Sequence, residues 1–282
     1  MSNNYSFTTN KDFSINDFFE SNSLVAKCAF LLIVIFMFII LFKLGLFIVE
    51  WMSSANESPK LINGMVNANQ SIVFVQDPKL IGSKTIYRSD NQDKGIEFTW
   101  SVWIFIEDLQ YLENNYRCVF FKGNNSPQTT GLNFPNNAPG LYIMPNTNSL
   151  VVMMNSYDEI NEEIVIPDIP INNWVNVIIR CENTKMNVYI NGVITKSTQL
   201  MGVPKQNYGD VNVAMNGGFS GYISNLWYFN YALGTAAIQK IANDGPNITM
   251  ASASSVTNTK PTDYLSLRWH FYGAGDSYNP SA

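Results

Sequence analysis

The stretch Ile96–Glu107, with the sequence IEFTWSVWIFIE, decides the fold of this chain. Apolar residues stand at every second position, and the residues between them include Glu97, Thr99 and Ser101. A period of two is typical of a β-strand with one buried face. We predict that this buried face is formed by Ile96, Phe98, Trp100, Val102, Ile104 and Ile106.

Similar β-prone runs continue along the chain from about Gln70 onward. Clusters of Asn, Gly, Pro and Asp separate them, as expected of turns between strands. Asn191 and Gly192 stand together between two such runs, which is a strong signal for a tight hairpin. Only TAAIQKIA (235–242) predicts a short helix. This series predicts an all-β domain built as a two-sheet sandwich.

Three stretches of the series resemble a known family: FTWSVWIFIED (98–108), NNWVNVIIRCENTKMNVYINGVIT (172–195) and GGFSGYISNLWYFNYALGTAAIQKIA (217–242). Their order and spacing are similar to those of the concanavalin A-like, laminin-G type jelly roll. The resemblance covers about residues 67–242 and implies a two-sheet jelly-roll sandwich. It implies little about function, because such sandwiches serve as lectins, glycosidases and adhesion modules.

An apolar segment precedes the sandwich. Residues 28–49, CAFLLIVIFMFIILFKLGLFIV, contain a single charge, Lys43, and are long enough to cross a bilayer as a helix. The polar, slightly acidic sequence before the segment is unlike the basic start of a cleaved signal peptide. We therefore predict an uncleaved single-pass anchor, with Lys27 and Lys43 near its two ends and Trp51 at interface depth. Its orientation stays open, because these two lysines lie at opposite ends.

Composition divides the chain into five predicted segments. They are a polar N-terminal segment (1–23), a transmembrane helix (24–51), a linker (52–66), the sandwich (67–242) and a C-terminal extension (243–282). The extension is rich in Ser, Thr and Asn before it becomes β-prone at YLSLRWHF (264–271).

The overall composition excludes nucleic acid as a partner. Of the 282 residues 46% are hydrophobic and 14% charged, the net charge is −5, and Lys and Arg form no run. The one histidine, His270, is expected to be a bystander and not a catalyst. Cys28, Cys118 and Cys181 are too few for a disulfide scaffold. A Cys118–Cys181 bridge and two buried free thiols both stay open.

The spacing of the acidic residues predicts that the protein is not an enzyme. Glycosidases of the resembling family carry alternating carboxylates on one strand, because cleavage needs two of them beside the scissile bond. The segment YDEINEEIVIP (157–167) lacks that alternation and is interpreted as a solvated loop leading into a strand. No Cys or His cluster has metal-ligand spacing, so we expect no cofactor. Calcium stays open, because Asp158, Asp168 and Asp210 offer oxygen ligands.

Large aromatic rings fall on the strand face that is expected to be wet. Trp103 and Phe105 lie on that face of the first strand, and Tyr189 alternates away from Val188 and Ile190. An aromatic platform at such a place indicates that something covers it. A glycan, a partner protein and the chain's own C-terminal tail are the three candidates. Trp103, Phe105 and Tyr189 are therefore the predicted binding residues.

The stretch GFSGYISNLWYFNYALG (218–234) is apolar on both faces, which is typical of a strand buried on both sides. We predict that its role is structural. One parity holds Ile223, Trp227, Phe229 and Tyr231, and the other holds Tyr222, Leu226 and Tyr228.

Together these features predict a non-enzymatic structural or binding protein held at a lipid bilayer. The arrangement of one span and one sandwich, with abundant Asn and low charge, resembles membrane-anchored minor capsid proteins of large icosahedral DNA viruses. That resemblance implies a place between an internal virion membrane and the capsid, with shell proteins as partners. The alternative is a single-pass cell-surface or endomembrane lectin that binds glycans. The sequons at Asn56, Asn69, Asn124 and Asn247 would fit this alternative.

Overall fold

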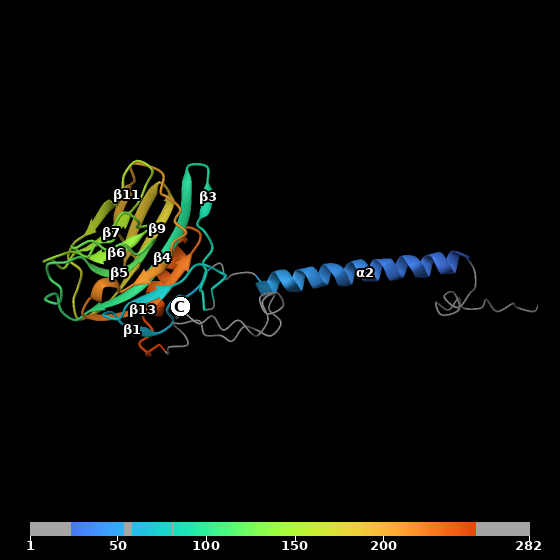
Figure 1. Cartoon of the computed structure of the whole chain (residues 1–282), viewed down its shortest axis with the longest axis horizontal. Coiled ribbons are helices and arrows are strands. Elements are labelled where there is room, and N and C mark those ends of the chain that lie inside the picture. The colour runs from blue at the N-terminus through green and yellow to red at the C-terminus, as the bar shows by residue number, and fades with distance from the viewer. Residues whose placement is uncertain (1–23, 54–57, 81, 252–282) are drawn as a thin grey trace, which may run out of the picture. The chain divides into compact units, whose positions relative to one another are not determined.

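The structure, a computed structural model, describes residues 24–53, 58–80 and 82–251 (Figure 1). The predictions for residues 1–23, for Asn56 and for the extension after residue 251, with His270, lie outside these ranges; of Trp51 only the backbone is described. The chain divides into two units, and the apolar helix and the sandwich are described separately.

The apolar segment forms one long helix, α2 (Leu24–Ser53). Its part Leu24–Ile48 has 25 residues and a mean hydropathy of 3.0, so it is long and apolar enough to cross a bilayer. The side chains of Lys27 and Lys43 are exposed on this helix. A membrane span and a signal sequence share these properties, and the uncleaved anchor therefore stays a prediction.

The strands form two antiparallel sheets, which confirms the predicted sandwich (Figure 1). Sheet A runs in the order β1-β13-β4-β9-β10-β11, and β3 pairs with β4 outside this path. Its strands are β1 (Met65–Asn67), β3 (Asp90–Gln92), β4 (Gly95–Ile106), β9 (Trp174–Asn183), β10 (Lys185–Ile190), β11 (Val193–Gln199) and β13 (Gly221–Phe229).

Sheet B runs in the order β2-β12-β5-β6-β7-β8. Its strands are β2 (Ile72–Phe74), β5 (Arg117–Lys122), β6 (Gly140–Ile143), β7 (Leu150–Met154), β8 (Glu162–Ile166) and β12 (Val211–Val213). The 3-10 helix η1 (Met215–Gly217) follows β12, and the helix α3 (Thr235–Asp244) follows β13.

The main core lies between the two sheets, and β4 contributes the face that its alternation predicts. Every apolar residue of that face, from Ile96 to Ile106, is buried there. The ring of Trp100 lies 5.0 Å from that of Phe120 in sheet B and 4.7 Å from that of Tyr228. Burial of large apolar side chains such as these is the main stabilising term of a sandwich.

β13 is buried on both faces as predicted, but its predicted parity is wrong. Its register against β4 shifts within Ser224–Trp227, and Asn225 has a φ of 49°. A bulge inserts one residue and reverses the side to which the later residues point. Ile223 therefore shares the core with Tyr228, whereas Phe229 lies on the outer face of sheet A.

The packed domain extends beyond residues 67–242 at both ends. Leu61 and Ile62, which fall in the predicted linker, are fully buried in the core. The Leu61 amide donates to the carbonyl of Leu226 at 2.8 Å. After α3, the amide of Ala251 donates to the carbonyl of Met65 in β1, also at 2.8 Å. Segments assigned to the linker and the extension are thus parts of the sandwich.

Cys118 and Cys181 are both free and buried. Cys181 lies in the core between the sheets, and Cys118 lies in a separate cluster on the outer side of sheet B. No bridge joins them, so the alternative of two buried thiols holds.

Candidate functional site

The chain itself covers part of the outer face of sheet A. After β13 it turns back across this face and enters α3. Ile238 of α3 is buried there against Ile178 of β9, Phe229 of β13 and Leu233. This part of the face is therefore a second, smaller core and not a free surface.

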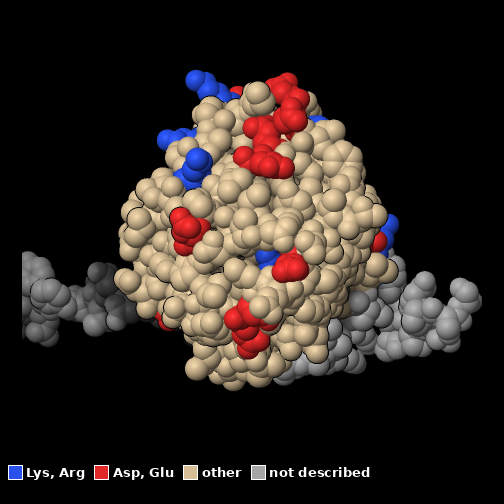
Figure 2. All heavy atoms as spheres, turned by 90° about the vertical axis from the view of Figure 1, so that its left-hand side faces the viewer, with Lys and Arg blue, Asp and Glu red and all other residues tan. Residues whose placement is uncertain are grey.

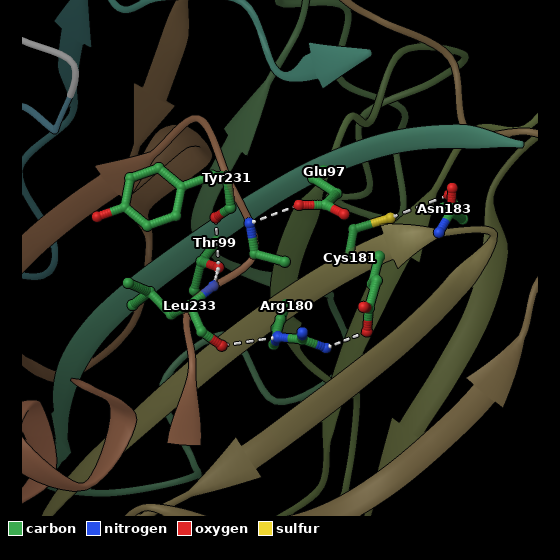
Figure 3. Close-up of polar contacts among 9 residues, drawn as sticks. Glu97, Thr99, Arg180, Cys181, Asn183, Tyr231 and Leu233 are labelled. Carbon is green, nitrogen blue, oxygen red and sulfur yellow. Dashed lines mark hydrogen bonds and ion pairs between the residues drawn. The ribbon is translucent and has the colours of Figure 1, made fainter. Parts of the chain in front are cut away.

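A polar network fixes the segment that leads into α3 (Figure 3). The hydroxyl of Thr99 donates to the carbonyl of Tyr231 at 2.9 Å and accepts from the amide of Leu233 at 3.0 Å. Arg180 donates through Nε to the Leu233 carbonyl at 2.8 Å and pairs through Nη1 with Glu182. Buried polar groups on the sheet are thus satisfied by the covering segment, which makes the cover part of the fold.

Two of the three predicted binding residues lie under this cover. Trp103 is 6% exposed and lines a cavity of about 30 Å³ together with Trp227, Asp244 and Gly245. Tyr189 packs against the cluster around Ile238. Both rings are in contact with the chain's own residues; Trp103 is buried and Tyr189 is half-buried.

Phe105, the third predicted residue, lies in a different setting. It stands directly opposite Tyr222 of β13 on one side and Trp174 of β9 on the other. The Phe105 ring lies 6.3 Å from that of Tyr222 and 5.5 Å from that of Trp174. All three side chains are half-buried. We call Tyr222, Phe105 and Trp174 the aromatic row.

The described domain also carries an open hollow of about 580 Å³. It lies among the loops 107–116, 144–149 and 167–173, which join β4 to β5, β6 to β7 and β8 to β9. Amide, hydroxyl and carboxylate groups line it beside apolar side chains. The lining residues are Leu109, Asn146, Thr147, Asn148, Asp168, Ile169, Pro170 and Ile171.

The side chain of Arg117 connects two of the loops around the hollow. It is 1% exposed, and its guanidinium donates to the carbonyls of Leu109 at 2.9 Å, Met144 at 2.7 Å and Thr147 at 3.4 Å. Burial lowers the pKa of Arg117, and the nearby carboxylate of Asp108 opposes this shift. Charged donors make strong hydrogen bonds, so Arg117 fixes two loops in one arrangement.

Backbone hydrogen bonds join the loops to one another as well. The amide of Asn146 donates to the carbonyl of Glu113 at 2.7 Å, and the amide of Ile169 donates to that of Asn148 at 3.0 Å. The hollow is therefore a preformed feature, as is usual for binding sites.

The surface around the hollow combines exposed apolar side chains with polar and acidic ones. Ile171 is 40% exposed, and Tyr111 and Leu112 of the first loop are also exposed. The three loops contain four acidic residues, Glu107, Asp108, Glu113 and Asp168, and no lysine. Figure 2 shows one face of the domain, on which Asp and Glu gather at the top of the view and otherwise occur as single patches. Apolar residues with sparse charge are typical of protein interfaces.

The structure places the other predicted candidates far from a shared site. In the described part of the chain, no three His, Cys, Asp or Glu side chains lie together as a metal site would require. Asp168 borders the hollow, while Asp210 accepts from the amide of Gln76 at 2.8 Å. Glu162 of the acidic segment accepts from the amide of Met201, also at 2.8 Å.

Sequence reasoning names only Asp168 among the residues of the hollow, because the lining comes from three loops far apart in the chain. Within the lining, Asn146 and Asp168 have left-handed backbone conformations, with φ values of 56° and 58°. Asn and Asp tolerate this conformation, which marks turns and not sites.

The two antiparallel sheets define a jelly-roll β-sandwich domain. A family model described as the concanavalin A-like lectin/glucanases superfamily matches residues 82–239, which is more than half of the chain. The chain therefore belongs to this superfamily. No curated protein matches the chain.

Solved structures of similar fold include bacterial toxin domains. The receptor-binding domain of botulinum neurotoxin D is 14% identical, with a TM-score of 0.45 over 67% of this chain and 44% of that one. The binding domain of Paraclostridial Mosquitocidal Protein 1 is also 14% identical, with a TM-score of 0.45 over 64% and 42%. The chain thus covers less than half of these domains, and the likeness concerns the fold alone. Neither the family model nor these two structures is described as a capsid protein.

Proposed function

We propose that the protein is a non-enzymatic binding protein, anchored in a membrane by α2, that holds a partner at the loop end of its sandwich. The observation that carries this proposal is the preformed hollow, which Arg117 stabilises and which Ile171 borders with an exposed apolar side chain. A rigid site loses less conformational entropy when its partner binds.

The outer side of sheet B supports a role without catalysis. Its centre is filled by buried apolar side chains, among them Phe121, Tyr142 and Met153. The hydroxyl of Tyr142 donates to the side chain of Asn137 at 2.7 Å, which holds the loop before β6 over this face. Glycoside hydrolysis requires an open substrate cleft with two carboxylates close together. The buried apolar side chains and the loop before β6 occupy the place where such a cleft would lie on this face.

A protein is the partner that the surface favours. Asp168 is the one charged residue among the eight that line the hollow, and charge depletion characterises the centre of protein interfaces. In its most specific form, the proposal places the sandwich between an internal virion membrane and a capsid shell. In that form α2 resists extraction while the loop end engages a shell protein.

The second candidate is a lectin, and the polar lining of the hollow favours it. Asn146, Asn148 and Asp168 offer donors and acceptors suited to sugar hydroxyls, and Pro170 offers an apolar surface beside them. Binding of glycans by the full chain in nanodiscs, lost on Asp168→Asn, would support this candidate over a protein partner.

Crosslinking mass spectrometry on the native, membrane-bound protein tests the proposal. The crosslinker should react with carboxylates, because the loops carry Glu107, Asp108, Glu113 and Asp168 but no lysine. We expect repeated crosslinks from these loops to one abundant protein.

A matched pair of variants makes the experiment specific. Ile171→Asp should abolish the crosslinks, and Ile160→Asp should retain them, because Ile160 is 47% exposed in the loop between β7 and β8 at the other end of the sandwich. Crosslinks that stay within the chain, or that both variants retain, would contradict the proposal.

A further inference from the structure

The hollow lies at one end of the sandwich, and the connections between strands divide evenly between the two ends. β9 begins where β4 ends, since Trp174 pairs with Phe105, and β6 ends where β5 begins, since Ile143 pairs with Arg117. The pairing registers of both sheets thus place six connections at the end that carries the hollow. They are residues 68–71, 107–116, 144–149, 167–173, 191–192 and 214–220.

These six connections carry charge of one sign only. Their charged residues are Glu107, Asp108, Glu113 and Asp168. The six connections at the opposite end are residues 75–89, 93–94, 123–139, 155–161, 184 and 200–210. They contain as many basic residues as acidic ones, and these are Asp77, Asp93, Asp158, Glu159 and Asp210 beside Lys79, Lys84, Arg88, Lys94 and Lys205. The excess of negative charge therefore belongs to the end with the hollow.

Arg117, which directly follows one of the acidic connections, presents no cation at the surface. Its side chain is 1% exposed, and its guanidinium donates to the carbonyls of Leu109, Met144 and Thr147. The buried guanidinium offsets one of the four negative charges. A partner that approaches this end still meets carboxylates in excess.

Asp168 brings this charge into the hollow itself. It is exposed, lines the hollow, and forms no ion pair within the part of the chain that the structure describes. The side chains of Asn146, Thr147 and Asn148 add neutral acceptor oxygens to the lining, and Ile171 contributes to an apolar wall. The hollow thus combines one anionic acceptor, several neutral acceptors and apolar surface.

A lysine or arginine side chain suits this combination. Its aliphatic stem can pack against the apolar wall while its charged head donates to the carboxylate and the neutral oxygens. The volume of about 580 Å³ lies within the range of ligand pockets, about 300–1,000 Å³, and admits such a side chain. An anionic lipid surface or a nucleic acid would be repelled by the same charge.

We infer that the partner presents a basic segment to the end with the hollow. A lysine or arginine of this segment enters the hollow beside Asp168, and neighbouring apolar side chains pack against Ile171. Complementary charge of this kind speeds association and fixes the orientation of the partner. The inference rests on the proposed function, which requires a protein partner, and it specifies the chemistry of the surface that this partner offers.

The salt dependence of the crosslinks from the hollow loops tests the inference. The full chain in its native membrane is crosslinked at about 0.1 M and at about 1 M NaCl, between which the Debye length falls from about 10 Å to about 3 Å. Only crosslinks that start at Glu107, Asp108 or Glu113 are counted, relative to crosslinks within the chain. We expect the yield from wild type to fall several-fold at the higher salt concentration, because salt screens the attraction between the basic segment and the carboxylates.

Asp168→Asn is the test variant, and Asp158→Asn is its matched control. Asparagine keeps the shape of aspartate and tolerates the φ of 58° at position 168. At the lower salt concentration we expect the yield from Asp168→Asn to lie several-fold below that of wild type. Asp158 is exposed in a connection at the opposite end, so Asp158→Asn should give the wild-type yield.

The possible failures of the inference and of the proposed function are distinguishable. Partner crosslinks that do not weaken with salt would overturn the inference and leave the proposed function in place. Equal yields from Asp168→Asn and wild type, or an equal fall in both variants, would do the same. A wild-type protein without any crosslink from these loops to a partner would contradict the proposed function and the inference with it.

Discussion

The guanidinium of Arg117 reaches from β5 to the backbone of Leu109, with Nη1 lying 2.9 Å from the carbonyl oxygen. This bond joins a sheet B strand to the loop that leaves β4 of sheet A. Arg117 therefore links the two sheets at the end of the sandwich that carries the hollow, and the proposed function depends on this end.

Replacement of Arg117 by methionine should destabilise the domain and loosen the hollow. The carbonyls of Leu109, Met144 and Thr147 would lose their donor, and we expect the free energy of unfolding to fall by about 2–4 kcal/mol. Chemical unfolding and hydrogen exchange in residues 107–116 and 144–149 measure both effects. Arg88→Met is the control, because Arg88 is exposed. Equal stability of the two variants would contradict this role.

The substitution Thr99→Val should loosen the segment between β13 and α3, where the chain begins to cover the outer face of sheet A. Valine keeps the shape of threonine but loses the bonds to Tyr231 and Leu233. We expect a loss of about 1–3 kcal/mol, since the partners would stay buried without the hydroxyl. Hydrogen exchange of α3 should rise in parallel. Thr195→Val in the exposed strand β11 is the matched control and should change neither quantity.

The buried side chain of Lys122 should make the free energy of unfolding depend on pH. Burial lowers the pKa of this lysine from 10.5 to about 8, although the carboxylate of Asp210 opposes the shift. The unfolded chain therefore binds more protons than the folded chain between these two values. The contribution of Lys122 to the free energy of unfolding should rise with pH across this window, by up to about 1.4 kcal/mol per pH unit.

The comparison of wild type with Lys122→Met isolates this contribution. Burial raises the pKa of Cys118 and Cys181 to about 12, which lowers the stability of both proteins at high pH. The difference in the free energy of unfolding between wild type and Lys122→Met does not contain this shared effect. We expect the stability of wild type relative to the variant to increase from pH 8 to pH 10 in urea titrations. A difference that does not change with pH would rule out a buried titrating lysine.

The thiols of Cys118 and Cys181 should be inert in the folded protein. Both are free and buried, and their raised pKa leaves almost no thiolate at neutral pH. N-ethylmaleimide at pH 7.5 should label neither residue until urea unfolds the domain. Labelling of the native protein would contradict their burial, and a peptide joining the two after non-reducing digestion would contradict the free state.

Local patterns predicted the strands well because each strand carries its own signal. The alternation of Ile96–Ile106 needs no distant residue to be interpreted, and it matches the buried face of β4. The Asn191-Gly192 turn behaves likewise, with φ values of 50° and 79° that suit a tight hairpin.

Features that depend on a single irregularity or on distant segments escaped prediction. The bulge at Asn225 reverses the parity of β13, and nothing in the strand's apolar pattern marks its place. The burial of Trp103 depends on α3 and Gly245, which lie more than a hundred residues further along the chain. The hollow is assembled from three loops, so its lining has no common pattern in the sequence.

The attachment of Ser58–Ile62 has a mechanical consequence. The indole of Trp227 donates to the carbonyl of Ser58 at 2.8 Å, the ammonium of Lys60 lies 4.5 Å from the centre of the Trp227 ring, and Leu61 is fully buried. A pulling force that arrives along the chain from α2 would act on this clasp before it reached any strand of the core. Its rupture would draw Leu61 and Ile62 out of the core, so the clasp would be the first part of the domain to resist such a load.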